Sequence, residues 1–225
     1  MKKGQVAIGV GIGLVVSAGL YILFKKYILS GFKSAIISNA NKEWKLWGSP
    51  VIVGGKLEES GEFECTPIYK ERVGEYWKKG TDKNYDGCDR GTPWSSAFIS
   101  FIMKKSGAGN EFPYSSAHTN YIRPFIQNRK QNNNSDFKGY KIHEVKPEKG
   151  DLICYPRQRG VNYDTTSSYK SHCDIVVDVN RKRKNIEVIG GNVSNGVTKR
   201  IVSIDSKGYL NDNTQDWFTI LKNSK

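Results

Sequence analysis

The stretch TPWSSAFISFIMKKSG, residues 92–107, predicts the helix around which the rest of the domain folds. Thr92 before Pro93 is a helix-start signal, because the threonine oxygen can accept a free backbone N–H and proline fits the first helical position. Apolar side chains then recur at helical intervals along one side, and Gly107 supplies the stop. We therefore expect a buried helix that starts at Pro93 and carries Ser95 in its first turn.

The segments around this helix predict an α+β domain. Residues 69–79 have apolar side chains at helical spacing, and SSAHTNYIRPFI, residues 115–126, has the pattern of another helix start. Short runs typical of strands follow, at residues 140–145, 151–155, 173–179, 186–189, 198–204 and 217–221. Because helices precede strands, we expect helices packed on an antiparallel sheet.

The first residues predict a membrane anchor. Residues 5–24 form an uncharged run of 20 residues between lysines, which is about the length that crosses a bilayer as a helix. A cleaved signal peptide is the main alternative. Gly9 and Gly13 share one face of this run and would allow two such helices to pack as a homo-oligomer. We predict a transmembrane anchor at 1–26, a linker or helical extension at 27–43 and one folded domain at 44–225.

The net charge of +13 favours anionic partners. The first 33 residues hold five lysines and no acid, so the remaining chain still carries 13 minus 5, or +8. Nucleic acid, phospholipid and acidic wall polymers all fit this balance. The densest cluster, RKRK at residues 181–184, lies between two apolar alternating runs and has the pattern of a solvated hairpin turn, so nucleic acid is not the expected partner.

The four cysteines are too few and too scattered for a disulfide-dominated scaffold, and the sequence leaves open whether one or two bridges form. No cysteine or histidine spacing typical of zinc sites occurs. We therefore expect neither a metal nor another cofactor.

Three polar residues fall at the ends of predicted elements. Ser95 lies in the first helical turn, His172 opens the strand CDIVVDV, and Asn192 closes the strand IEVIGGN. In a hydrolase, such a histidine would take the proton of the hydroxyl and a third side chain would orient the ring. We predict Ser95 as nucleophile, His172 as base and Asn192 as the orienting group. Ser95 as a helix cap and Asn192 as a turn residue remain alternatives.

Other polar and aromatic residues near these positions are candidates for substrate binding, namely Trp94, His118 and Asp174. Cys88 precedes the helix and is a rival nucleophile. Cys173 adjoins the histidine, but neighbours on a strand face opposite ways, so it is expected to pack inward.

Four strings carry a resemblance to a known group. PWSSAFISFIMKKSG resembles the nucleophile helix of CHAP-type and NlpC-type peptidoglycan amidases and endopeptidases, with Ser95 at the cysteine position. GDLICYPR, SHCDIVVDV and VIGGNVSN resemble the strands that follow in those enzymes. The serine form is most similar to a branch catalogued as domain-of-unknown-function family 2272. The resemblance implies a papain-like fold and cleavage of amide bonds in peptidoglycan.

The expected function is therefore a membrane-anchored cell-wall hydrolase on the extracytoplasmic face, which in a phage would suit lysis or a virion protein. Serine is a poorer nucleophile than cysteine, which keeps a second interpretation open: an inactive papain-like module that binds the cell wall or serves as a structural component. An esterase of the same fold is a third.

Overall fold

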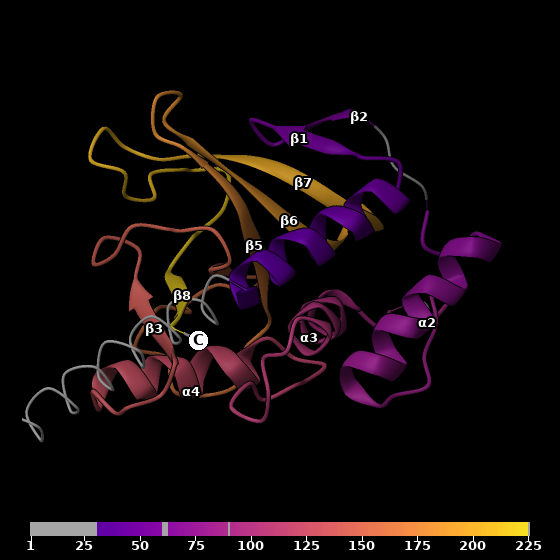
Figure 1. The fold of residues 1–225 in the computed structure, drawn as a ribbon, viewed down its shortest axis with the longest axis horizontal. Coiled ribbons are helices and arrows are strands. Elements are labelled where there is room, and N and C mark those ends of the chain that lie inside the picture. The colour runs from indigo at the N-terminus through magenta and orange to yellow at the C-terminus, as the bar shows by residue number, and fades with distance from the viewer. Residues whose placement is uncertain (1–30, 60–62, 90, 225) are drawn as a thin grey trace, which may run out of the picture.

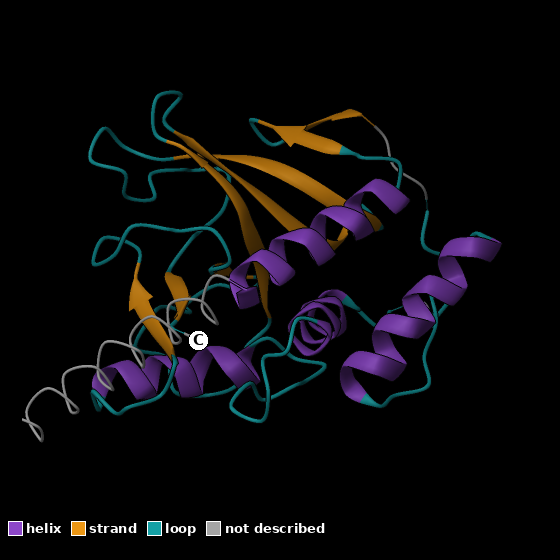
Figure 2. Ribbon diagram, in the orientation of Figure 1, coloured by secondary structure: helices purple, strands orange, loops and turns teal. Residues whose placement is uncertain are grey.

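The computed structural model describes residues 31–59, 63–89 and 91–224. Its helices lie on one side of a large twisted sheet (Figure 1, Figure 2). A helix over residues 31–46 comes first. It is followed by α2 (Pro67–Thr81), α3 (Ser95–Lys105) and α4 (Thr119–Lys130). The central helix α3 is buried along most of its length, as its apolar spacing predicts.

The sheet has eight strands in the order β2-β1-β7-β6-β5-β4-β8-β3. Their bounds are β1 (Val51–Val53), β2 (Lys56–Glu59), β3 (Phe137–Lys141), β4 (Leu152–Pro156), β5 (Ser171–Asn180), β6 (Asn185–Val193), β7 (Gly196–Ser203) and β8 (Thr219–Asn223). The pair β1 and β7 is parallel, and the other pairs are antiparallel. The sheet is therefore mixed, and the expectation of an antiparallel sheet is wrong. The parallel pair arises because the hairpin of β1 and β2, which precedes α2 in the chain, adds to the edge of the sheet beside β7.

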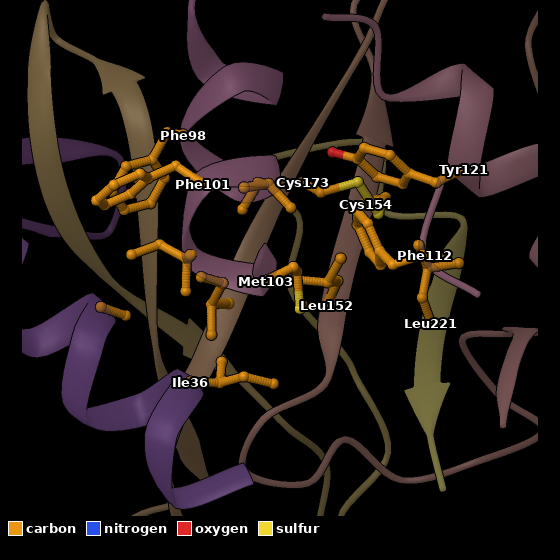
Figure 3. Packing of buried hydrophobic residues seen from close by; sticks show 14 of the residues in the cluster. Ile36, Phe98, Phe101, Met103, Phe112, Tyr121, Leu152, Cys154, Cys173 and Leu221 are labelled. Carbon is orange, nitrogen blue, oxygen red and sulfur yellow. A yellow bond between two sulfur atoms is a disulfide. The ribbon is translucent and has the colours of Figure 1, made fainter. Parts of the chain in front are cut away.

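Each face of the sheet has its own apolar core. The larger core lies between the helices and the sheet and includes Phe98, Tyr121 and Cys173 (Figure 3). The smaller core lies on the opposite face and includes Tyr155 and Trp217. Since successive residues of a strand point to opposite faces, the side chains of each strand pack alternately into the larger and the smaller core.

The expected transmembrane helix and membrane-anchored location are not supported. Within the described ranges, no helix is both long and apolar enough to cross a bilayer. The segment expected to do so, residues 1–26, lies outside the described residues, as do Gly9 and Gly13, the basis of the expected homo-oligomer. We carry neither expectation further.

Part of the segment expected to be a linker or helical extension packs into the domain. Phe32, Ile36 and Ala40 are buried in the larger core. Glu43, also fully buried, accepts a hydrogen bond from the Tyr76 hydroxyl at 2.8 Å and pairs with Arg72 of α2. The packed core therefore includes residues that precede Trp44.

The four cysteines form two disulfide bonds, Cys65–Cys88 and Cys154–Cys173. Disulfides of this kind are typical of proteins that fold in oxidising compartments outside the cytoplasm. No thiol is left at Cys88 or Cys173, so in this state neither can act as a nucleophile.

Candidate functional site

Ser95 is the first residue of α3. The helix begins two residues later than expected, with Trp94 at the position before it, so Thr92 does not cap it. The Ser95 hydroxyl instead lies 2.7 Å from Nε2 of His118. The alternative of a helix-capping serine is therefore not what the structure shows, because this side chain reaches across to another element.

His118 lies immediately before α4, and both of its ring nitrogens have partners. Nδ1 is hydrogen-bonded to the hydroxyl of Tyr121, which is three residues further along the chain. Ser96 lies close enough to Tyr121 to oppose the rise of its pKa, and the Ser96 hydroxyl donates to the carbonyl of Ser115 at 2.8 Å. The three groups Ser95, His118 and Tyr121 form one continuous chain of hydrogen bonds.

The tautomer of His118 decides what it can do. With the proton on Nδ1 and donated to the Tyr121 oxygen, Nε2 keeps its lone pair and can accept from the Ser95 hydroxyl. This tautomer is the one that a general base needs.

Burial supports the same protonation state. His118 is 4% exposed, and burial holds the pKa of its imidazole well below the usual value of 6.5, with nearby His172 lowering it further. Burial also raises the pKa of Tyr121 above its usual value of 10, so the phenol keeps its proton. Near neutral pH, His118 is thus an uncharged acceptor beside a hydroxyl.

Ser95 and His118 line a cleft of about 690 Å³. Its described lining includes Arg157, Tyr169 and Lys170 and contains no aspartate or glutamate. The cleft is therefore polar and positively charged next to the hydroxyl.

His172 and Asp174 form a second buried pair on β5, and the His172 ring lies next to that of His118 with centroids 5.4 Å apart. His172 Nε2 lies 2.9 Å from one carboxylate oxygen of Asp174, and the other oxygen accepts from Arg200 at 3.3 Å. Arg200 also donates to the hydroxyl of Tyr155 at 3.2 Å. Burial alone would raise the pKa of Asp174, but Arg200 and His172 hold it below its usual value. Burial lowers the pKa of His172 and outweighs the opposing attraction of Asp174.

Strand alternation explains why His172 does not meet Ser95. Cys173 faces the helices, where it is bonded to Cys154 of β4 in the larger core (Figure 3). Its neighbour His172 therefore starts toward the other face, and its ring lies between Tyr155 and His118, with centroids 5.2 Å and 5.4 Å away, without a hydrogen bond to Ser95. The β5 residue that lines the Ser95 cleft is Ser171. The base predicted from the sequence, His172, is thus replaced at the hydroxyl by His118.

Asn192 lies beside His172 but does not complete a triad with it. It sits at a β-bulge, where the register of β6 against β7 shifts between Gly191 and Val193, and its φ is +55°. Both Asn192 and His172 line a second, smaller pocket of about 220 Å³. The left-handed backbone at the bulge fits the alternative interpretation of Asn192 as a turn residue. No described hydrogen bond joins its side chain to His172, as the predicted orienting role requires.

Trp94 does not line either pocket. It is 2% exposed, its ring stacks on Trp47 with centroids 5.5 Å apart, and its Nε1 donates to Glu64 at 2.5 Å. The structure therefore places Trp94 in the core and not against a substrate.

The two glycines before Asn192 also shape the site, although they were not among the residues predicted from the sequence. A Cβ atom on Gly190 would lie 1.8 Å from Asp174 Oδ1, and one on Gly191 would lie 2.5 Å from the Phe98 side chain. Gly190 thus makes room for the pair of His172 and Asp174, and Gly191 lets α3 approach the sheet. Adjacent glycines inside a strand pattern are a signal of close approach that would have identified both.

Within the described ranges, no group of three histidine, cysteine, aspartate or glutamate side chains is placed to hold a metal ion. The family described as "Uncharacterized protein conserved in bacteria (DUF2272)" matches residues 64–223, which span α2 to β8 and include Ser95, His118 and His172. No curated protein and no solved structure matches the chain. Because the match covers more than half of the sequence, the chain belongs to this bacterial family.

Proposed function

We propose that this protein is a serine-dependent acyl hydrolase in which Ser95 is the nucleophile and His118 is the base. The proposal rests on one observation: the Ser95 hydroxyl lies 2.7 Å from Nε2 of His118, a buried imidazole whose pKa is held well below its usual value, so that it is uncharged near neutral pH. A nucleophile within hydrogen-bond reach of a base that a third group orients is the arrangement of serine hydrolases. Here Tyr121 takes the orienting role.

The reaction would follow from this geometry in two stages. Ser95 Oγ attacks the substrate carbonyl as its proton passes to His118 Nε2, and the first-turn N–H groups of α3, which have no partner within the helix, stabilise the oxyanion. The tetrahedral intermediate collapses, the C–N bond breaks, and His118 returns the proton to the departing amine. Water then adds to the acyl-serine with His118 again as base, which releases the acid and restores Ser95.

Peptidoglycan is the substrate we propose, with the papain-like superfamily as its structural setting. The resemblance of four strings to cell-wall amidases supports it, and so do the two disulfides, because the wall lies in an oxidising space. The positively charged cleft suits a polymer that bears carboxylates. The active site would differ from those enzymes, because its base comes from the segment before α4 and not from a strand.

Zymography on purified cell wall, together with turnover of a small activated ester, tests the proposal. Ser95→Ala and His118→Gln should each lower turnover by about a thousandfold or more. His143→Gln is the matched control, because His143 is exposed and lines neither pocket, and it should keep full turnover. Full turnover by Ser95→Ala would refute the proposal. If His172→Gln abolishes turnover and His118→Gln preserves it, the general base is His172 of β5 and not His118.

A binding module without turnover is the second candidate, and the burial of the site favours it. Ser95 and His118 are each only 4% exposed, so a substrate must displace neighbouring groups to reach the hydroxyl. Sedimentation of the protein with insoluble cell wall separates the two functions. Sedimentation of the parent without any release of soluble wall fragments would support the binding module.

A further inference from the structure

The smaller pocket adjoins the Ser95 cleft, and one residue belongs to both. Arg157 follows β4 and lines the pocket of about 220 Å³ as well as the cleft of about 690 Å³. The smaller pocket is also lined by His172, Asn192 and Arg200. A molecule whose reacting carbonyl lies at Ser95 can therefore extend past Arg157 toward this pocket.

The charge of the smaller pocket is positive. Its described lining holds two arginines and no aspartate or glutamate. Asp174 pairs with Arg200, whereas no described carboxylate forms an ion pair with Arg157. Arg157 is exposed and therefore offers a free planar guanidinium, which binds a carboxylate through two parallel hydrogen bonds.

One residue that lines this pocket, His172, also has an unused acceptor. His172 is 1% exposed, and its Nε2 is taken by Asp174. Its Nδ1 is buried and has no hydrogen-bond partner among the described residues. Because Asp174 is ionised and accepts the Nε2 proton, Nδ1 of neutral His172 carries a lone pair. A buried acceptor of this kind needs an N–H or O–H donor, and leaving it without one costs free energy.

The size of the pocket limits what it can hold. About 220 Å³ is below the range of roughly 300–1,000 Å³ that whole drug-sized ligands occupy, so the pocket suits a terminal group. Asn192, turned by the bulge, adds an amide that can both donate and accept.

We propose that this pocket binds the carboxylate terminus of a peptide, with the carboxylate on Arg157 and the adjacent amide N–H directed to His172. The inference rests on the proposed function, since it assigns the far end of the substrate that Ser95 would attack. Arg157 then selects acyl substrates that end in a free acid, and His172 serves in binding.

Binding of two matched probes to the Ser95→Ala variant tests this assignment without any turnover. The probes are N-acetyl-dialanine as the free acid and the same dipeptide as its C-terminal amide, titrated by two-dimensional NMR. The acid should bind at least about tenfold more tightly than the amide, because charge-assisted hydrogen bonds are roughly twice as strong as neutral ones. Added salt should narrow this difference.

Two variants in the same background locate the selectivity. Arg157→Gln should bind acid and amide equally, whereas Arg159→Gln should keep the preference, because Arg159 is exposed on the same loop but lines neither pocket. Three results would overturn the proposal: equal binding of the acid and the amide by the Ser95→Ala protein, no binding of the acid, or a preference for the acid that survives Arg157→Gln. Tighter binding of inorganic phosphate than of the acid would overturn the assignment to a carboxylate. The hydrolase proposal is judged separately, by the turnover of Ser95→Ala.

Discussion

Removal of one oxygen atom, in Tyr121→Phe, tests whether the hydrogen-bond chain sets the protonation of His118. Tyr121 is fully buried, and its hydroxyl is hydrogen-bonded to Nδ1 of His118. The ring of phenylalanine fills the same space in the core, so the change deletes the hydroxyl and little else. In the tautomer that the proposed reaction needs, His118 Nδ1–H is then left without an acceptor in a buried site.

The size of the effect follows from that unsatisfied donor. Such a group costs about 1–3 kcal/mol, and His118 can avoid the cost by moving its proton to Nε2, where it donates to Ser95. That tautomer cannot accept the serine proton. If the Nε2–H tautomer is favoured by about 1–3 kcal/mol, the fraction of enzyme with an unprotonated Nε2 falls by roughly 5- to 150-fold, and kcat/KM falls with it. The free energy of unfolding should fall by a similar 1–3 kcal/mol at most.

Three measurements check this prediction together: kcat/KM with an activated ester, urea unfolding, and the nitrogen NMR signals of His118, which distinguish the tautomers. Tyr163→Phe is the matched control, because the buried Tyr163 hydroxyl donates to the carbonyl of Gly139 at 2.7 Å and lines neither pocket. The control should lose about 1 kcal/mol of stability and no turnover. Undiminished kcat/KM in Tyr121→Phe, or a parent enzyme with its proton on Nε2, would refute the reasoning.

Burial raises the pKa of Asp151 to about 6 from 3.8. The protonated carboxyl therefore contributes its full stability below pH 3.8, and this contribution is lost as the pH rises through 6. Asparagine does not titrate, so the free energy of unfolding of Asp151→Asn, measured with urea, should rise relative to that of the parent by up to about 3 kcal/mol across that pH range. Gly191→Ala should lose about 1–3 kcal/mol in the same assay, because its Cβ would meet Phe98 at 2.5 Å; unchanged stability would mean that α3 has room to move. Replacing Cys154 and Cys173 together with alanine should lower stability by about 3 kcal/mol, and calorimetry of the oxidised parent and the double variant measures it.

The elements with strong local periodicity were predictable from the sequence. The helix expected from Pro93 was found as α3, and the strand expected at residues 173–179 was found as β5, Ser171–Asn180. The turn expected at the RKRK cluster connects β5 to β6. The parallel pairing of β1 was not predictable, because a strand of three residues carries no periodic signal and its partner β7 lies far along the chain.

The choice of a partner for Ser95 is limited by the small number of histidines. The chain has three, and the structure places His143 on an exposed turn after β3. Cys173 was expected to face the core, and the alternation of a strand then turns His172 away from the helix that carries Ser95. His118 remains as the imidazole on the side of the nucleophile. What the sequence could not supply is the distance, because the segment that carries His118 has no period, and its position is set by Tyr121 and by the packing of α4. The expectation of His172 came from its position at the start of a predicted strand, and the resemblance agreed with it. The alternation of that strand, which follows from backbone geometry, was the stronger guide to the face on which His172 begins.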